Sequence, residues 1–375
     1  MIIGGILIII IAVVGVLLFL NSKNKSTAVN ANTPIATDNT NTNTNTSTTP
    51  DPTNPVTTPV GGILASDKIK KLSDSSVVAP ILSVDEKAVW FFTNDGHLYK
   101  VNLSTGLKQE SLLPEKLTVS NAIWPQLGND FIVVSGSGSA KTFSYYNSDL
   151  ANTAGQKFGT FPANVHEIDY LQDGKHIAYN WVNGATSTLA IANFDLANYE
   201  NIVTLPAPDL NIKMSPNGNR ALLYNETNSG DGNLYYVSFK TKKLITLHTS
   251  MDNAAIWSGD GIKFLYNRDS GDGTKNTKLW LGDSDTATNK EIALNGSVSK
   301  ATFDKSGNFV FVAVSNGDSD DIWKVDTKTL AKTKVFSGTD SGTIKINATN
   351  LFVSADDATL YFKNDDGYLY SVPIK

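Results

Sequence analysis

The chain has 375 residues, a net charge of −5 and an isoelectric point of about 5.4. This acidic balance argues against sequence-independent binding to nucleic acid, because such binding needs Lys and Arg to displace counterions from phosphates. The absence of cysteine excludes disulfides, thiolate nucleophiles and cysteine-ligated zinc. A chain of this length can hold one large all-β domain.

Residues 2–20 (IIGGILIIIIAVVGVLLFL) contain no charged side chain. As an α-helix they would span roughly 28 Å, at about 1.5 Å per residue, which matches the apolar core of a bilayer. A cleaved signal peptide and a buried core helix are the alternatives, but signal peptides usually have an apolar part of only about 7–15 residues. We therefore expect residues 1–25 to form an uncleaved transmembrane anchor with its flank.

Residues 26–60 are dominated by Thr, Asn and Pro and offer little apolar surface to bury, so they are expected to form a disordered stalk. Stalks of this kind are typical of cell-surface proteins, which favours a single-pass protein of the cell membrane with an extracytoplasmic domain. Lys23 and Lys25 favour the opposite orientation, because positive charge normally stays cytoplasmic. A start upstream of Met1 could supply basic residues ahead of the apolar run, which would favour the extracytoplasmic orientation.

From about Val78 to the end, one pattern recurs at intervals of roughly 43 to 50 residues, and such periods are typical of propellers and solenoids. The clearest copy covers residues 212–247. Its short runs of β-branched and aromatic residues are bounded by turn formers, so each copy predicts four antiparallel strands joined by hairpins.

Seven copies align on one frame. A large apolar residue precedes the first hairpin turn in each copy: Leu82, Trp124, Tyr170, Met214, Trp257, Phe303 and Val353. Two residues earlier, on the same strand face, are Pro80, Ala122, Ile168, Ile212, Ala255, Ala301 and Leu351. The frame predicts an all-β, seven-bladed β-propeller at residues 61–375, with the repeated aromatic residues packed between blades.

The seventh copy ends after its third strand, while residues 67–72 precede the first blade and are similar to residues 242–245 of the fourth copy. We expect residues 67–72 to supply the outer strand of blade seven, which would close the ring and cover an open edge.

The Ser-Pro-Asn-Gly turn at residues 215–218, with the Leu-Tyr and Ile-Trp strands that recur later in the copies, resembles the WD-repeat-like motif of TolB-type β-propellers. It is also similar to the propellers of prolyl-oligopeptidase-like peptidases. The resemblance covers residues 61–375. Neither the α/β domain of TolB nor the hydrolase domain of the peptidases accompanies it here, so the partners and catalysis of those families are not implied.

Three features suggest chemistry without completing a motif. Residues 136–142 (GSGSAKT) resemble a phosphate-binding loop but lie between predicted strands, which favours a hairpin tip. Loops at residues 228–233, 269–276 and 316–321 are rich in Asp, Asn and Gly, yet none has the complete calcium-loop pattern, although Asp318, Asp320 and Asp321 could offer oxygen ligands. No two of the histidines share a ligand spacing (His97, His166, His176 and His248). No nucleophile elbow is present.

Function is expected where the copies differ. The loops that enter the innermost strands converge on the mouth of the central channel, where no packing rule dictates the residue type, and a solvated rim without function is the alternative reading. These loops carry His166, Asp209, Asp252, Asn253 and Lys300.

The sequence favours a monomeric, non-enzymatic binding or scaffolding module for a protein, peptide or glycan, with no cofactor and no metal. The alternative is a cell-surface hydrolase or lyase with its active site at the channel mouth.

Overall fold

The computed structural model describes residues 57–59, 68–111, 113, 116–125, 130–147, 156–225, 232–269 and 277–374. Regular structure in this part of the chain is β, apart from three short 3-10 turns, η1 (Gly138–Ala140), η2 (Val298–Lys300) and η3 (Gly338–Ser341). The expected anchor at residues 2–20 lies outside the described residues. Within them, no helix is both long enough and apolar enough to cross a membrane.

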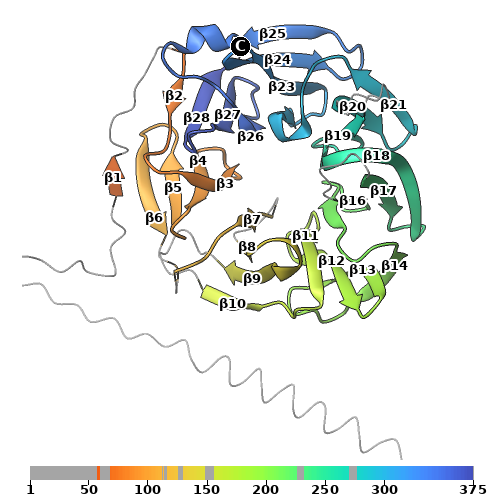
Figure 1. The fold of residues 1–375 in the computed structure, drawn as a ribbon. Helices are drawn as coiled ribbons and strands as arrows, with labels where there is room; N and C mark the ends of the chain where they lie inside the picture. The colour runs from red at the N-terminus through yellow and green to blue at the C-terminus, as the bar shows by residue number, and fades with distance from the viewer. Residues whose placement is uncertain are drawn as a thin grey trace, which may run out of the picture. The chain divides into compact units, whose positions relative to one another are not determined.

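Antiparallel four-stranded units follow one another round a ring (Figure 1). Blade one consists of β3 (Val77–Leu82), β4 (Ala88–Thr93), β5 (Leu98–Asn102) and β6 (Leu107–Ser111), and blade two of β7 (Asn121–Ile123), β8 (Asp130–Ser135), β9 (Thr142–Asn147) and β10 (Gln156–Thr160). Blade three consists of β11 (Val165–Tyr170), β12 (His176–Asn183), β13 (Thr186–Asn193) and β14 (Glu200–Leu205). Blade four begins with β15 (Asn211–Met214), β16 (Arg220–Tyr224) and β17 (Gly232–Ser238), and blade five ends with β19 (Lys263–Asp269), β20 (Thr277–Asp283) and β21 (Thr288–Ile292). Blade six consists of β22 (Ala301–Phe303), β23 (Phe309–Asn316), β24 (Ser319–Asp326) and β25 (Lys332–Phe336), and blade seven begins with β26 (Thr349–Val353), β27 (Thr359–Lys363) and β28 (Leu369–Pro373). The predicted seven-bladed β-propeller is confirmed.

Blades four and five share a strand. β18 (Lys243–Trp257) pairs with β17 through its first part and with β19 through its second, so the two blades form one seven-stranded sheet. The sequence places Asp252 and Asn253 in a loop between blades. This expectation is wrong, because the backbone of both residues belongs to β18. A register shift between Asp252 and Ala255 lets the strand turn from one blade to the next without leaving the ladder.

The ring is closed by the strand that the sequence predicts. β2 (Lys70–Lys71) pairs antiparallel with β28, with Lys70 opposite Ser371 and Lys71 opposite Tyr370. The side chains on either side of β2 anchor it in two different interfaces. Ile69 packs into the cluster between blades six and seven, and Leu72 into the cluster between blades seven and one.

The described buried apolar side chains form seven clusters, each between two neighbouring blades. The repeated large apolar residue lies at or just beyond the end of each innermost strand, as the sequence frame predicts. The side chains of two of these residues also hydrogen-bond to the preceding blade. The indole of Trp124 donates to the carbonyl of Ala79, and that of Trp257 donates to the carbonyl of Lys213, each at 2.9 Å. The repeated position therefore joins blades through both packing and hydrogen bonds.

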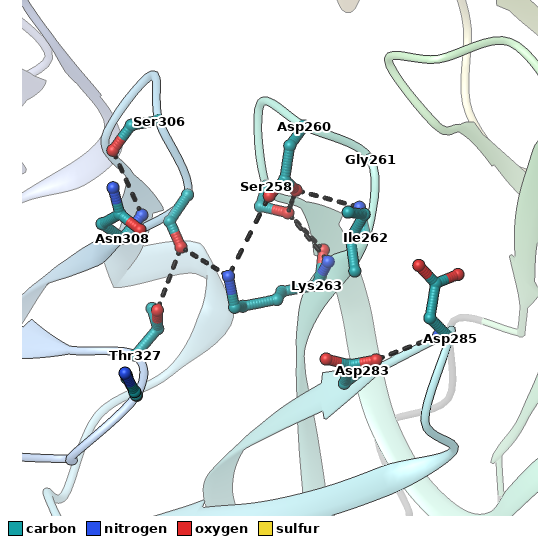
Figure 2. Close-up of polar contacts among 12 residues, drawn as sticks. Ser258, Asp260, Gly261, Ile262, Lys263, Asp283, Asp285, Ser306, Asn308 and Thr327 are labelled. Atoms are coloured by element: carbon teal, nitrogen blue, oxygen red, sulfur yellow. Dashed lines mark hydrogen bonds and ion pairs between the residues drawn. The ribbon is translucent and has the colours of Figure 1, made fainter.

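Polar contacts join the turns of blades five and six (Figure 2). In blade five, Ser258 Oγ donates to Asp260 Oδ1 at 2.5 Å, which fixes the turn. Lys263 Nζ reaches into the next blade and donates to the carbonyl of Gly307 at 3.2 Å, and Thr327 Oγ1 donates to the same carbonyl at 3.0 Å. Turn residues that repeat along the sequence thus have a structural role.

β1 (Thr57–Pro59) adds a fifth strand to the outer edge of blade one by pairing with β6. The sequence assigns these residues to the stalk at 26–60. Threonine has a high strand propensity, and β6 would otherwise present an unpaired edge, so the pairing has a local physical reason.

Candidate functional site

A cavity of about 670 Å³ lies within the ring, lined by the innermost strands of blades two to seven and by the hairpin tip after β8. Pleated strands place alternate side chains toward this space. Its exposed polar side chains come from several blades: Asn121, Lys213, Ser299 and Asn350. Cavities of about 300–1,000 Å³ with convergent polar groups are typical ligand sites.

An ion pair crosses the wall of this cavity between blades two and three. Lys141, at the start of β9, donates to Glu167 on β11, and both side chains are largely shielded from solvent. The glycine-rich segment at residues 136–142 is a hairpin tip containing η1, as predicted, and it delivers Lys141 to the cavity. Lys141 and Glu167 are not predicted as channel-mouth residues by the repeat frame, although Glu167 directly follows His166.

His166 and Asp209, both predicted at the channel mouth, lie side by side. His166 Nδ1 is 2.9 Å from Asp209 Oδ1, which joins the start of β11 to the loop before β15. The imidazole is partly shielded, whereas the Asp209 side chain is 64% exposed. A carboxylate on one ring nitrogen orients the imidazole and leaves the other nitrogen available for a ligand or a proton.

Lys300 has a different environment from the other predicted rim residues. Its Nζ is 2.9 Å from Asp320 Oδ2 and donates to Asn347 Oδ1 at 2.6 Å. Asp320 is only 2% exposed, and its carboxylate also accepts hydrogen bonds from Ser315 Oγ and the backbone N–H of Ala348. Lys300 therefore balances a buried charge between blades six and seven, a role that the repeat pattern does not predict.

The side chains of Asp252 and Asn253 lie outside the described residues, and only their backbone in β18 is placed.

The acidic loop at residues 316–321 forms a hairpin rather than a cluster of ligands. Asp320 and Asp321 are consecutive residues of β24 and therefore point to opposite faces. Burial alone would raise the pKa of Asp321, but hydrogen bonds from Lys334 and the N–H of Gly338 outweigh it and hold this pKa below its usual value. Among the described residues, no group of three or more His, Asp or Glu side chains is arranged to hold a metal.

The remaining histidines have separate partners. His97 lies 2.6 Å from Glu110, and His176 pairs with Asp173 in a turn of blade three. His248 lies 2.8 Å from the hydroxyl of Tyr266, and burial lowers its pKa. A separate blade for each histidine, as the repeat frame predicts, is wrong for one pair, because His176 on β12 shares blade three with His166 on β11.

Comparison with solved structures identifies the architecture. An oligogalacturonate lyase in complex with manganese aligns with a TM-score of 0.61 at 12% identity, over 86% of this chain and 96% of the lyase. The oligogalacturonate lyase of Vibrio parahaemolyticus aligns with a TM-score of 0.60 at 12% identity, over 86% and 97%. The Swd1 β-propeller domain of Myceliophteria thermophila aligns with a TM-score of 0.56 at 10% identity, over 82% and 100%. The fold is WD40-like.

No family model matches the chain, and no curated protein matches its sequence. Identities of 12% or less establish this WD40-like propeller fold and leave function to the site itself.

Proposed function

We propose that this protein is a binding or scaffolding module that holds a protein, peptide or glycan ligand at the mouth of its central channel. The observation that carries the proposal is the cavity of about 670 Å³ lined by six blades. Its carboxylate Glu167 is engaged by Lys141, whereas Asn121, Ser299 and Asn350 present exposed amides and hydroxyls. Such groups recognise polar ligands through hydrogen bonds.

Site-specific photo-crosslinking in cells that express the full chain tests the proposal. A photoreactive amino acid at Ser299 or Asn350, both exposed in the cavity, is expected to give discrete adducts. The matched controls are Lys243 and Lys290, which are exposed on outer strands. Adducts from the two control positions, with none from the cavity, would move the binding site to the side of the propeller.

An enzyme is the second candidate, and the His166–Asp209 pair is the observation that favours it. An imidazole oriented by a carboxylate can act as a general base, for example in a lyase reaction that removes a proton next to a carbonyl group. Turnover of oligogalacturonate or of ester, peptide and glycan panels by the purified chain, lost in His166→Asn, would establish this alternative. Binding without turnover supports the first candidate.

We further propose that residues 2–20 anchor the chain in the cell membrane and that the propeller is extracytoplasmic. The support is the uncharged apolar run and the Thr/Asn/Pro-rich segment that follows it. Protease added to intact cells is expected to release a fragment that begins within residues 26–56, ahead of β1. Complete protection until the cells are lysed would show that the propeller faces the cytoplasm.

A further inference from the structure

A second cavity, of about 540 Å³, lies on one face of blade three, and none of its described lining residues is among those that line the channel. We call it the blade-three groove. Its lining comes from β12, β13, β14 and the turn before β14, and it includes the aromatic side chains of Tyr179, Trp181 and Tyr199.

The strand register explains why the groove is open. Trp181 lies opposite Thr188, and Asn183 lies opposite Thr186, so each β12 residue has a small neighbour on β13. Residues two apart on a strand share a face, which places Tyr179 in the same row as Trp181. The centroids of the two rings are 6.4 Å apart, and the ring planes are nearly perpendicular. Tyr179 is buried and packs against Trp181. Small neighbours thus leave the aromatic row uncovered.

Tyr199 extends this row into solvent. It is 65% exposed, which makes it the most exposed large apolar side chain among the described residues. The described part of the chain gives Tyr199 no ring contact with Tyr179 or Trp181.

The polar groups of the groove are neutral. Its amides and hydroxyls belong to Asn183, Thr186, Thr188 and Asn201, and none of these four side chains hydrogen-bonds within the described residues. The described lining residues include no Lys, Arg, Asp or Glu. An anionic ligand would require basic groups, and a metal ion would require carboxylates.

We propose that the blade-three groove binds a neutral oligosaccharide. A pyranose ring has an apolar face of C–H groups and an edge of hydroxyls. Trp181 and Tyr199 supply flat surfaces for the first, and the Asn and Thr side chains supply donors and acceptors for the second. The volume is within the usual range for small ligands, about 300–1,000 Å³. This site is independent of the channel-mouth proposal.

Affinity electrophoresis of the purified full-length chain tests the groove. Non-denaturing gels are cast with hydroxyethyl cellulose, arabinoxylan, galactomannan or laminarin as neutral probes, and with polygalacturonate as the anionic comparison. We expect at least one neutral polymer to slow the protein and polygalacturonate to have no effect. Titration with the matching tetrasaccharide then gives the dissociation constant.

The variants locate the binding. Tyr199→Ala and Asn201→Ala, at exposed positions that do not threaten folding, are expected to weaken binding about tenfold, whereas Tyr199→Phe keeps the ring and stays within about twofold of the wild type. Ile245→Ala and Leu107→Ala remove exposed apolar side chains elsewhere and are expected to have no effect. The proposal would be overturned if Tyr199→Ala bound as tightly as the wild type, or if polygalacturonate alone slowed the protein. It would also be overturned if no neutral tetrasaccharide bound at concentrations up to about 10 mM.

Discussion

A chain that lacks residues 1–74 should unfold at a much lower temperature than one that lacks only residues 1–60. Both lack β1, so the difference reports the closing strand β2. Ile69 is 1% exposed and Leu72 is 3% exposed, and the hydroxyl of Ser73 accepts a hydrogen bond from the N–H of Leu369 at 2.9 Å. Loss of two buried aliphatic side chains costs about 2–5 kcal/mol each, which approaches the whole stability of many domains. Thermal and urea unfolding measure the effect.

Point substitutions in the full chain provide the control for this truncation. Ile69→Ala combined with Leu72→Ala should reproduce most of the loss. Lys68→Ala removes only an exposed ion pair with Asp340 and should change the free energy of unfolding by less than about 1 kcal/mol. Equal melting temperatures for the two truncated chains would show that β2 does not hold the ring closed.

Replacing Lys300 with Met should destabilise the propeller by about 3 kcal/mol, because it leaves the buried carboxylate of Asp320 without its cation. Lys345→Met is the matched control. Its partner Asp318 is 82% exposed, so the pair contributes little. Urea unfolding of both variants separates the two cases. If both change stability equally, or if Lys300→Met loses ligand binding at wild-type stability, Lys300 is a rim residue and its ion pair with Asp320 contributes little.

The repeat frame predicted the blades and the closing strand because both depend on local patterns. Period-2 apolar positions and turn residues are set within each copy, and the strand at residues 67–72 is similar to the outer strand of copy four. The same reasoning could not predict that β18 runs on from blade four to blade five. A β-bulge redirects the strand there, and it needs no turn-forming residue that the sequence would reveal.

The site was only partly predictable. His166 and Asp209 meet because both loops enter innermost strands of adjacent blades, which the frame implies. The pairing of Lys141 with Glu167 depends on how two blades face each other, and no spacing within one copy encodes it. Lys300 was predicted on a loop, but its buried partner is 20 residues away on another strand.

The pairing of β2 with β28 also has a consequence for how the protein is made. Lys70 and Ser371 are neighbours in the sheet but lie at opposite ends of the domain's sequence. At about 5–20 residues per second, the ribosome needs roughly 15–60 s to synthesise the intervening residues. Throughout that time the first blade has no last blade to join, and its neighbouring hydrophobic face stays uncovered. The nascent propeller therefore carries an apolar blade face, the kind of surface that promotes aggregation, until its final residues emerge.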